Sequence, residues 1–355
     1  MIPLRFFSNY LFENVSNGLP TNQLQITSAC NAKCIFCSNE QNPFKIERGQ
    51  FREYEEIEKV LFSFYPADPQ QPIALNESLP GRISEGEAFL HPRFLDIIAL
   101  IRSRIPNPIQ ISTNGSFLTE DLVKQLSKYL PIQIRVSYPS FNSQYWIETF
   151  NLKEKDYQIA TKSFSLMKEH NINYKASIVP MPSWVGYKDI EKTIKFLAST
   201  GIEDLLVYAP GYTKFTKPEV VEKLVYDKKK LSDFLFSMRF KYNIPIHWAL
   251  DPNLELRLNR EAIYKAIYNN YKSGIKSFLW FTSESAAHRF ASFIDSLRGF
   301  PIHHAVIGIP NRTYGGNIEC TGLWMLEDLK PELSELQPSH IMIPNNFLDK
   351  FGFDL

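Results

Sequence analysis

The sequence contains little that would place a protein in a membrane or outside the cell. None of its 355 residues belongs to a run that approaches the roughly 18 uninterrupted apolar residues of a membrane-spanning helix. The N-terminal segment MIPLRFFSNYLFENV is interrupted by Arg5, Ser8 and Glu13, so it has no continuous apolar region of a signal peptide. The sequence therefore predicts a cytoplasmic protein with no membrane segment.

The chain also lacks a surplus of charge and a disulfide framework. Its 39 Lys and Arg residues against 38 Asp and Glu give a formal net charge of +1. A nucleic-acid-binding surface needs a stronger basic bias, so the charge argues against nucleic acid as a partner. Only four cysteines are present, and Cys30, Cys34 and Cys37 are close neighbours. Such spacing suits thiolate ligands in a reducing compartment better than disulfide pairing.

The order of apolar patterns predicts an α/β protein. From residue 20 to about 210, short β-branched or aromatic runs alternate with amphipathic stretches, as in repeated βα units around a parallel sheet. The expected strands are Gln23–Thr27, Gly81–Glu85, Ile109–Thr113, Ile132–Ser137, Asn173–Val179 and Asp204–Tyr208. Helices are expected to begin near Glu53, Arg93, Thr119, Lys155 and Lys188. These six units predict an incomplete (β/α)6 TIM-like barrel over residues 1–215, with its chemistry at the carboxyl ends of the strands.

After Pro210-Gly211 the pattern changes and predicts a smaller C-terminal α/β domain over residues 216–355, which we expect to cap the open end of the barrel. The expected helices are Asp227–Tyr242, Asn259–Tyr271 and Ser283–Leu297, the last capped by its serine. The expected strands are Ile244–Leu250, Ile275–Phe281, His303–Ile309 and Gly315–Leu323.

The three clustered cysteines follow directly on the first expected strand. They therefore lie on the loop at its carboxyl end, where a barrel carries its chemistry. Three thiolates on one loop can each bind a different iron of a [4Fe-4S] cubane, which leaves the fourth iron open. The sequence thus predicts Cys30, Cys34 and Cys37 as metal ligands.

Two other interpretations of these cysteines compete. The two-residue gap between Cys34 and Cys37 also fits half of a zinc knuckle. A fourth zinc ligand is not close in the sequence, because Cys320 is far along the chain and the nearest histidines are His91 and His170. Ordinary core cysteines are the second alternative, which the polar residues inside the loop disfavour.

The segment Cys30-Asn-Ala-Lys-Cys34-Ile-Phe-Cys37 resembles the signature of the radical S-adenosylmethionine (SAM) superfamily, including Phe36 before the last cysteine. The resemblance implies a [4Fe-4S] cluster and SAM as cofactors, with Phe36 at the cofactor. It also implies reductive cleavage of SAM to a 5′-deoxyadenosyl radical, which abstracts hydrogen from a small-molecule or peptide substrate. An external reductant of the flavodoxin or ferredoxin type is implied as well.

The segment Ser84-Glu85-Gly86-Glu87-Ala88 resembles the family's Gly-Gly-Glu-Pro loop, which binds the amino group of SAM. That task needs an acceptor carboxylate and a glycine that allows close backbone approach. Gly86 and Glu87 match the family pattern. Glu85 and Ala88 depart from it, because they replace the first glycine and the proline.

Later strands carry further matches. Ser112 and Asn114 belong to a third-strand motif whose polar side chains reach the ribose or carboxylate of SAM, and Ser137 matches the family's serine near that carboxylate. Arg135 shares a face with Ser137 by period-two alternation, so it is either an anion clamp inside the barrel or a surface salt bridge. Val179 is a candidate wall of the cofactor site or a core residue.

The C-terminal region is similar to a domain of unknown function found in a clostridial and cyanobacterial radical SAM group. The similar segments are Ser277–Ala286, Ile309–Asn311, Tyr314–Leu323 with Asp328, and Ile341–Leu348. Within this region, Cys320 is either the hydrogen donor of a radical epimerase or a buried residue. The alternative of a different class is a binding or scaffold protein that holds zinc or an iron–sulfur cluster without turnover.

Overall fold

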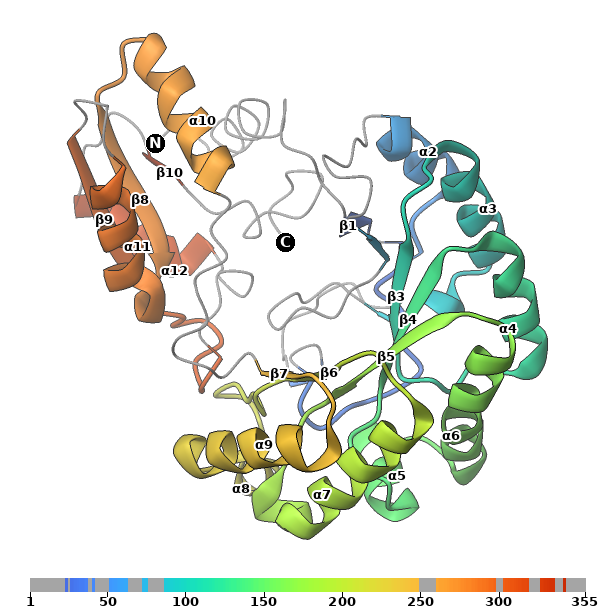
Figure 1. Cartoon of the computed structure of the whole chain (residues 1–355). Coiled ribbons are helices and arrows are strands. Elements are labelled where there is room, and N and C mark those ends of the chain that lie inside the picture. Colours follow the sequence, from blue (N-terminus) through green and yellow to red (C-terminus); the bar gives the residue numbers. More distant parts are fainter. Residues whose placement is uncertain are drawn as a thin grey trace. The chain divides into compact units, whose positions relative to one another are not determined.

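The computed structural model of the chain describes residues 23–24, 26–37, 40–41, 51–62, 72–75, 86–248, 260–297, 303–318, 326–335 and 341–342. These residues form two compact units, one with the strands β1 to β7 and the other with β8 to β10 (Figure 1).

The first unit is built on an open, parallel sheet of seven strands. Its strands follow the chain order from β1 to β7, and each neighbouring pair is parallel. The strands are β1 (Gln23–Leu24), β2 (Ile73–Leu75), β3 (Ile109–Thr113), β4 (Ile132–Ser137), β5 (Asn173–Ile178), β6 (Leu205–Val207) and β7 (Ile246–Trp248). Within the described ranges β7 does not pair with β1, so the sheet stays open. An incomplete TIM-like barrel is therefore confirmed as the fold class.

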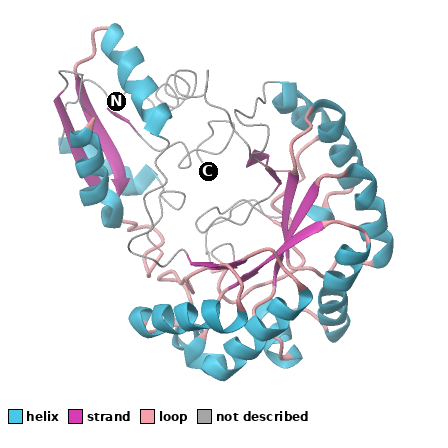
Figure 2. Ribbon diagram, in the orientation of Figure 1, coloured by secondary structure: helices cyan, strands magenta, loops and turns pink. Residues whose placement is uncertain are grey.

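Helices connect these strands and cover the outer face of the curved sheet (Figure 2). They are α2 (Tyr54–Phe62), α3 (Phe94–Arg104), α4 (Glu120–Leu126), α5 (Ser143–Phe150), α6 (Glu154–Glu169), α7 (Pro182–Thr200), α8 (Pro218–Leu224) and α9 (Lys228–Tyr242). Two short 3-10 turns, η1 (Ala88–Leu90) and η2 (Ser127–Tyr129), lie between them. The expected start of α4 is confirmed, because the Thr119 hydroxyl accepts a hydrogen bond from the backbone N–H of Leu122.

Alternation along the strands sorts side chains onto two faces. In β4 the two isoleucines and Val136 are buried in the apolar core, whereas Arg135 and Ser137 lie on the opposite face. Val136 lies next to Gly115 together with Ala160 of α6, so its face is the one that helices cover. The polar face of β4 therefore points into the barrel.

Two strands of the sheet differ from the expectation. The second strand is Ile73–Leu75, whereas residues 81–85, where the sequence predicted it, lie outside the described residues. The strand expected at 244–250 was assigned to the C-terminal domain, but β7 pairs with β6 and extends the first sheet to a seventh strand. Both errors concern short strands whose partners are distant in sequence.

The second unit has a parallel sheet of three strands in the order β10-β8-β9. Its strands are β8 (Ser277–Ser283), β9 (His303–Ile309) and β10 (Ile341–Met342), and its helices are α10 (Arg260–Lys272), α11 (Glu284–Ser296) and α12 (Leu326–Glu335). Ser283 occupies the N-cap of α11 without the capping hydrogen bond that we expected from its side chain. The strand predicted over 315–323 is not present in residues 315–318, which form a turn, and residues 319–323 lie outside the described ranges.

Among the helices that the structure describes, none combines the length and the apolar character that a membrane crossing requires.

Candidate functional site

The cysteine loop begins after β1 and is fixed to the C-terminal end of α5. The backbone N–H of Lys33 donates to the carbonyl of Phe150 over 2.9 Å, and that of Ile35 donates to the carbonyl of Thr149 over 3.0 Å. Phe36 packs edge-on against Phe150, with 6.4 Å between the ring centroids. The loop therefore has a defined path although it contains neither a helix nor a strand.

None of the three cysteines of the loop is part of a disulfide bond. Burial, followed by the charge of Glu87, raises the pKa of Cys30 to about 12. Burial also raises the pKa of Cys34 well above its usual value, and the neighbouring Cys37 and Cys30 raise it further. The three sulfur atoms are therefore close enough for the charge of one thiolate to raise the pKa of another. Because iron ligation requires thiolates, cluster assembly must release protons from these groups.

Gly86 and Glu87 pack directly against the start of this loop. The Gly86 N–H donates to the carbonyl of Thr27 over 3.1 Å, and the Glu87 N–H donates to the carbonyl of Ala29 over 2.7 Å. A Cβ atom at Gly86 would lie 2.0 Å from the Ala29 oxygen, so no other residue fits this path. We expected Gly86 to allow a close approach of the backbone, and the structure shows that its backbone closely approaches the cysteine loop.

The carboxylate of Glu87 is buried and only half satisfied. Its Oε2 accepts a hydrogen bond from the Asn114 backbone N–H over 3.0 Å, whereas Oε1 has no hydrogen-bond partner among the described residues. Burial raises its pKa to about 7, although hydrogen bonds from Asn114, Thr113 and Phe89 oppose the shift. A buried acceptor without a donor fits an ammonium group, such as the amino group of SAM.

Sequence reasoning missed two residues that connect these segments. The Asn31 side chain donates to the Ser116 hydroxyl over 2.9 Å and accepts from the Asn114 side chain over 2.9 Å. The available signal was that Asn31 follows Cys30 and that Ser116 follows the Asn114-Gly115 turn.

The other expected cofactor residues lie along the polar face or at strand ends. Ser112 on β3 carries a buried hydroxyl without a hydrogen-bond partner among the described residues. Ser137 ends β4 beside Ser177 of β5, and Val179 is buried just after β5. Their roles at the cofactor stay predictions. Cys320 lies outside the described residues, so its role as a hydrogen donor is also still a prediction.

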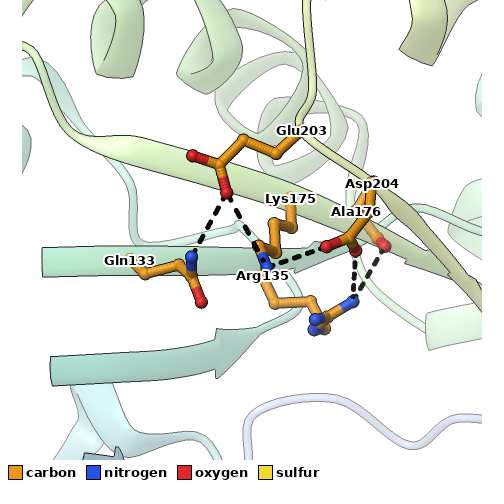
Figure 3. Close-up of polar contacts among 6 residues, drawn as sticks. All are labelled: Gln133, Arg135, Lys175, Ala176, Glu203 and Asp204. Carbon is orange, nitrogen blue, oxygen red and sulfur yellow. Dashed lines mark hydrogen bonds and ion pairs between the residues drawn. The ribbon is translucent and has the colours of Figure 1, made fainter. Parts of the chain in front are cut away.

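Arg135 points into the barrel, but its guanidinium already has an anion. Its Nη1 lies 3.1 Å from Oδ1 of Asp204, and Lys175 lies 2.8 Å from Oδ2 of the same carboxylate (Figure 3). Lys175 is the register partner of Arg135 on β5, and Asp204 directly precedes β6. The two cations therefore share one carboxylate across three neighbouring strands.

Replacing Asp204 with asparagine is expected to lower the free energy of unfolding by about 3 kcal/mol, because two largely buried cations lose their shared counter-charge. Urea unfolding of the variant and the wild type measures the difference. Glu120→Gln is the control, since its pair with Lys162 is solvent-exposed and should contribute less than about 1 kcal/mol. Equal effects of the two substitutions would contradict a stabilising role of the buried network.

His91, one of the two histidines nearest to the cysteine loop in the sequence, is engaged in other contacts. Among the described residues, no three His, Cys, Asp or Glu side chains, the loop cysteines included, are arranged around one point where a single metal ion could be held. His91 has both ring nitrogens engaged, because Nε2 lies 2.9 Å from the Arg52 carbonyl and Nδ1 lies 3.1 Å from the Arg93 backbone nitrogen. It is therefore not available as a fourth ligand. Thiols that each bind a different iron of a cubane do not need to converge on one ion.

Comparison with known proteins fits this geometry. The profile of the radical SAM superfamily matches residues 24–197, which include the cysteine loop, Glu87 and the strands β2 to β5. The chain carries a domain of the radical SAM superfamily. Cys30, Glu87 and Asn114 all lie within the segment that matches the family. The resemblance of the C-terminal region to a domain of unknown function is not tested by this match.

A relative from Pyrococcus furiosus is named as the cofactor-modifying protein of a tungsten-containing aldehyde ferredoxin oxidoreductase. It is 25% identical to this chain over 213 residues, which are 58% of this chain and 54% of the relative. The chain thus matches only about half of the length of this relative.

Two solved structures have similar folds. SuiB of Streptococcus suis, bound to SAM, aligns with a TM-score of 0.49 and 16% identity over 66% of this chain and 53% of SuiB. A spore photoproduct lyase variant aligns with a TM-score of 0.45 and 14% identity over 64% of this chain and 75% of that protein. Likeness of this degree carries no information on the substrate of this chain.

Proposed function

We propose that this chain is a radical SAM enzyme in which Cys30, Cys34 and Cys37 hold a [4Fe-4S] cluster next to a SAM site. When bound, the reduced cluster supplies the electron that cleaves SAM to a 5′-deoxyadenosyl radical, which then abstracts hydrogen from the substrate. The proposal is supported by the family match over residues 24–197 and by three cysteines on one loop that form no disulfide bond.

The observation that carries the proposal is the attachment of Glu87 to the cysteine loop. The backbone bond from Glu87 to Ala29 puts a buried carboxylate one residue away from the first thiol-bearing position. Its free Oε1 can accept from the ammonium group of SAM, and the Asn114 N–H holds the other oxygen in place. A fixed acceptor orients the cofactor without reorganisation when it binds.

The remaining residues of the site shape its walls. Phe36, held against Phe150, offers an aromatic surface beside the cysteines, and buried Val179 offers an apolar one at the end of β5. Ser112 and Ser137 offer hydroxyl groups on the polar face of the barrel. We assign these four residues to cofactor binding, with the apolar pair excluding water and the serines donating hydrogen bonds.

The substrate class that we propose is a small molecule or a peptide. The net charge of +1 argues against nucleic acid, and the name of the Pyrococcus furiosus relative refers to modification of a cofactor, which is a small molecule. An external flavodoxin- or ferredoxin-type protein is proposed as the electron source. The three free thiols are consistent with a reducing compartment such as the cytoplasm.

Anaerobic protein reconstituted with iron and sulfide and reduced with dithionite is expected to form 5′-deoxyadenosine from SAM. The matched control is the variant with Cys30, Cys34 and Cys37 replaced by alanine, treated in the same way. Chromatographic quantification of 5′-deoxyadenosine compares the two proteins. Equal product from the wild type and the triple variant would overturn the proposed function.

A further inference from the structure

Two asparagine side chains join the cysteine loop to the turn after β3. Asn31 is adjacent to Cys30, and its amide contacts both Asn114 and Ser116 over 2.9 Å. These partners are 83 and 85 positions away in the sequence, so the contacts depend on the fold and not on local chain geometry. The first cysteine of the motif is therefore tied to β3 through its immediate neighbour.

The amide of Asn114 is engaged at both ends by the protein itself. Its Nδ2 donates to Oδ1 of Asn31, and its Oδ1 accepts from the backbone N–H of Ser116 over 3.0 Å. The residue is buried, with 6% of its surface exposed. Each end of the amide keeps one unused hydrogen-bonding position, since the nitrogen has a second hydrogen and the oxygen a second lone pair. The two bonds that this side chain makes are both to the protein, whereas the family resemblance implies a contact with the cofactor.

The backbone of Asn114 adds a third connection, because its N–H donates to Glu87 over 3.0 Å. A continuous path of hydrogen bonds thus runs from Oε2 of Glu87, the bonded oxygen of the carboxylate, through Asn114 to Asn31 beside Cys30. It runs parallel to the backbone contact between Glu87 and Ala29. Two independent connections therefore fix the Glu87 carboxylate relative to the cysteine loop.

We propose that Asn31 and Asn114 are positioning residues, which couple the orientation of Glu87 to that of the cysteine loop without touching SAM. This inference rests on the proposed function. Because coupling between two sites is reciprocal, bound SAM then stabilises the loop that holds the cluster, and the ordered loop strengthens SAM binding by the same factor. Loss of the asparagine pair therefore weakens both the stabilisation of the loop by SAM and the binding of SAM.

The test uses full-length protein reconstituted anaerobically to equal iron content. Asn31→Ala is expected to keep its cluster but to bind SAM about tenfold more weakly by equilibrium dialysis, the scale of one or two lost hydrogen bonds. In the wild type, SAM should slow the transfer of iron to a chelator, and in Asn31→Ala this protection should be reduced. Asn270→Ala is the matched control, since the side chain of Asn270 donates to the carbonyl of Ala266 within its own helix, α10, and it should behave as wild type.

A double-mutant cycle separates positioning from direct contact. If the two asparagines act through their mutual bond, Asn31→Ala with Asn114→Ala should bind SAM no more weakly than the weaker single variant. Ser116→Ala removes only one acceptor and should show a smaller loss in the same direction, so it keeps the test decisive if Asn31→Ala does not fold.

Unchanged SAM affinity in Asn31→Ala or Ser116→Ala, beside a functional wild type, would overturn this inference alone. Additive losses in the double variant would assign a direct SAM contact to Asn114 and overturn it as well. A wild-type protein that assembles no cluster and cleaves no SAM would instead remove the proposed function, and the inference with it.

Discussion

Replacing Gly86 with alanine is expected to abolish SAM cleavage and to weaken SAM binding about a hundredfold. The added Cβ would lie 2.0 Å from the Ala29 oxygen and 2.6 Å from the carbonyl carbons of Ser28 and Ala29. Because these are backbone atoms, the chain must separate and lose the bonds from Gly86 and Glu87 to the cysteine loop. The loss of two backbone hydrogen bonds, at about 1 to 1.5 kcal/mol each, corresponds to the expected hundredfold weaker binding of SAM.

Equilibrium dialysis with SAM measures this effect at matched iron content. The control is Gly274→Ala, where a Cβ meets no atom within 4 Å and the positive φ of 87° costs about 1 to 2 kcal/mol of stability only. That variant should be somewhat less stable and bind SAM normally. A Gly86→Ala protein with wild-type affinity would show that the contact with the cysteine loop does not organise the site.

Exchanging Glu87 for glutamine should have opposite effects on binding and on stability. The loss of the carboxylate removes a charge-assisted bond to the SAM ammonium group, so SAM binding should weaken about ten- to a hundredfold. The folded protein, in contrast, should become more stable above neutral pH, because glutamine has no charge to bury. Both effects follow from one buried acceptor without a donor.

The pH dependence of that stability has a defined sign. Glu87 has a pKa of about 7 in the folded chain against 4.5 in the unfolded one, so the unfolded state loses its proton first. Wild-type stability should fall as the pH rises from 4.5 through 7, and Glu87→Gln should be more stable by about 3 kcal/mol at pH 8. Near pH 4.5 the two proteins should be nearly equal.

Urea unfolding of iron-free and SAM-free protein under reducing conditions gives this comparison. Glu191→Gln is the control with the opposite sign, since hydrogen bonds from Lys241 and Tyr242 lower the pKa of Glu191 and its carboxylate is favoured in the folded chain. It should gain no stability at pH 8. A Glu87→Gln protein that is less stable than wild type at pH 8 would contradict the buried, half-satisfied carboxylate.

The sequence predicted the elements whose local pattern was long enough to be periodic. Strands β3, β4 and β9 begin and end at the predicted residues, because each has at least five residues flanked by clear turns or helices. The three-residue strand β2 is too short to show alternation, and we placed it too late in the chain. The membership of β7 depends on its pairing with β6, which no local pattern encodes.

In the site, too, residues within a local sequence motif could be predicted, whereas contacts between distant segments could not. Cys30 is found by the local spacing of the cysteines, and Gly86 and Glu87 by their resemblance to a short family motif; the structure places all three at the loop that follows β1. The side-chain contact between Asn31 and Ser116 was missed because it joins segments 85 positions apart. Likewise, the fold alone brings Asp204 to Arg135, 69 positions earlier, as the anion that the arginine binds.

The central claim is that three thiolates hold an iron–sulfur cubane with one open iron. Iron, sulfide and zinc analysis of the anaerobically reconstituted wild-type chain tests it most directly. We predict about four iron and four sulfide per chain, and about none in the variant with Cys30, Cys34 and Cys37 replaced by alanine. One tightly bound zinc per chain, or iron that persists in the triple variant, would contradict the claim.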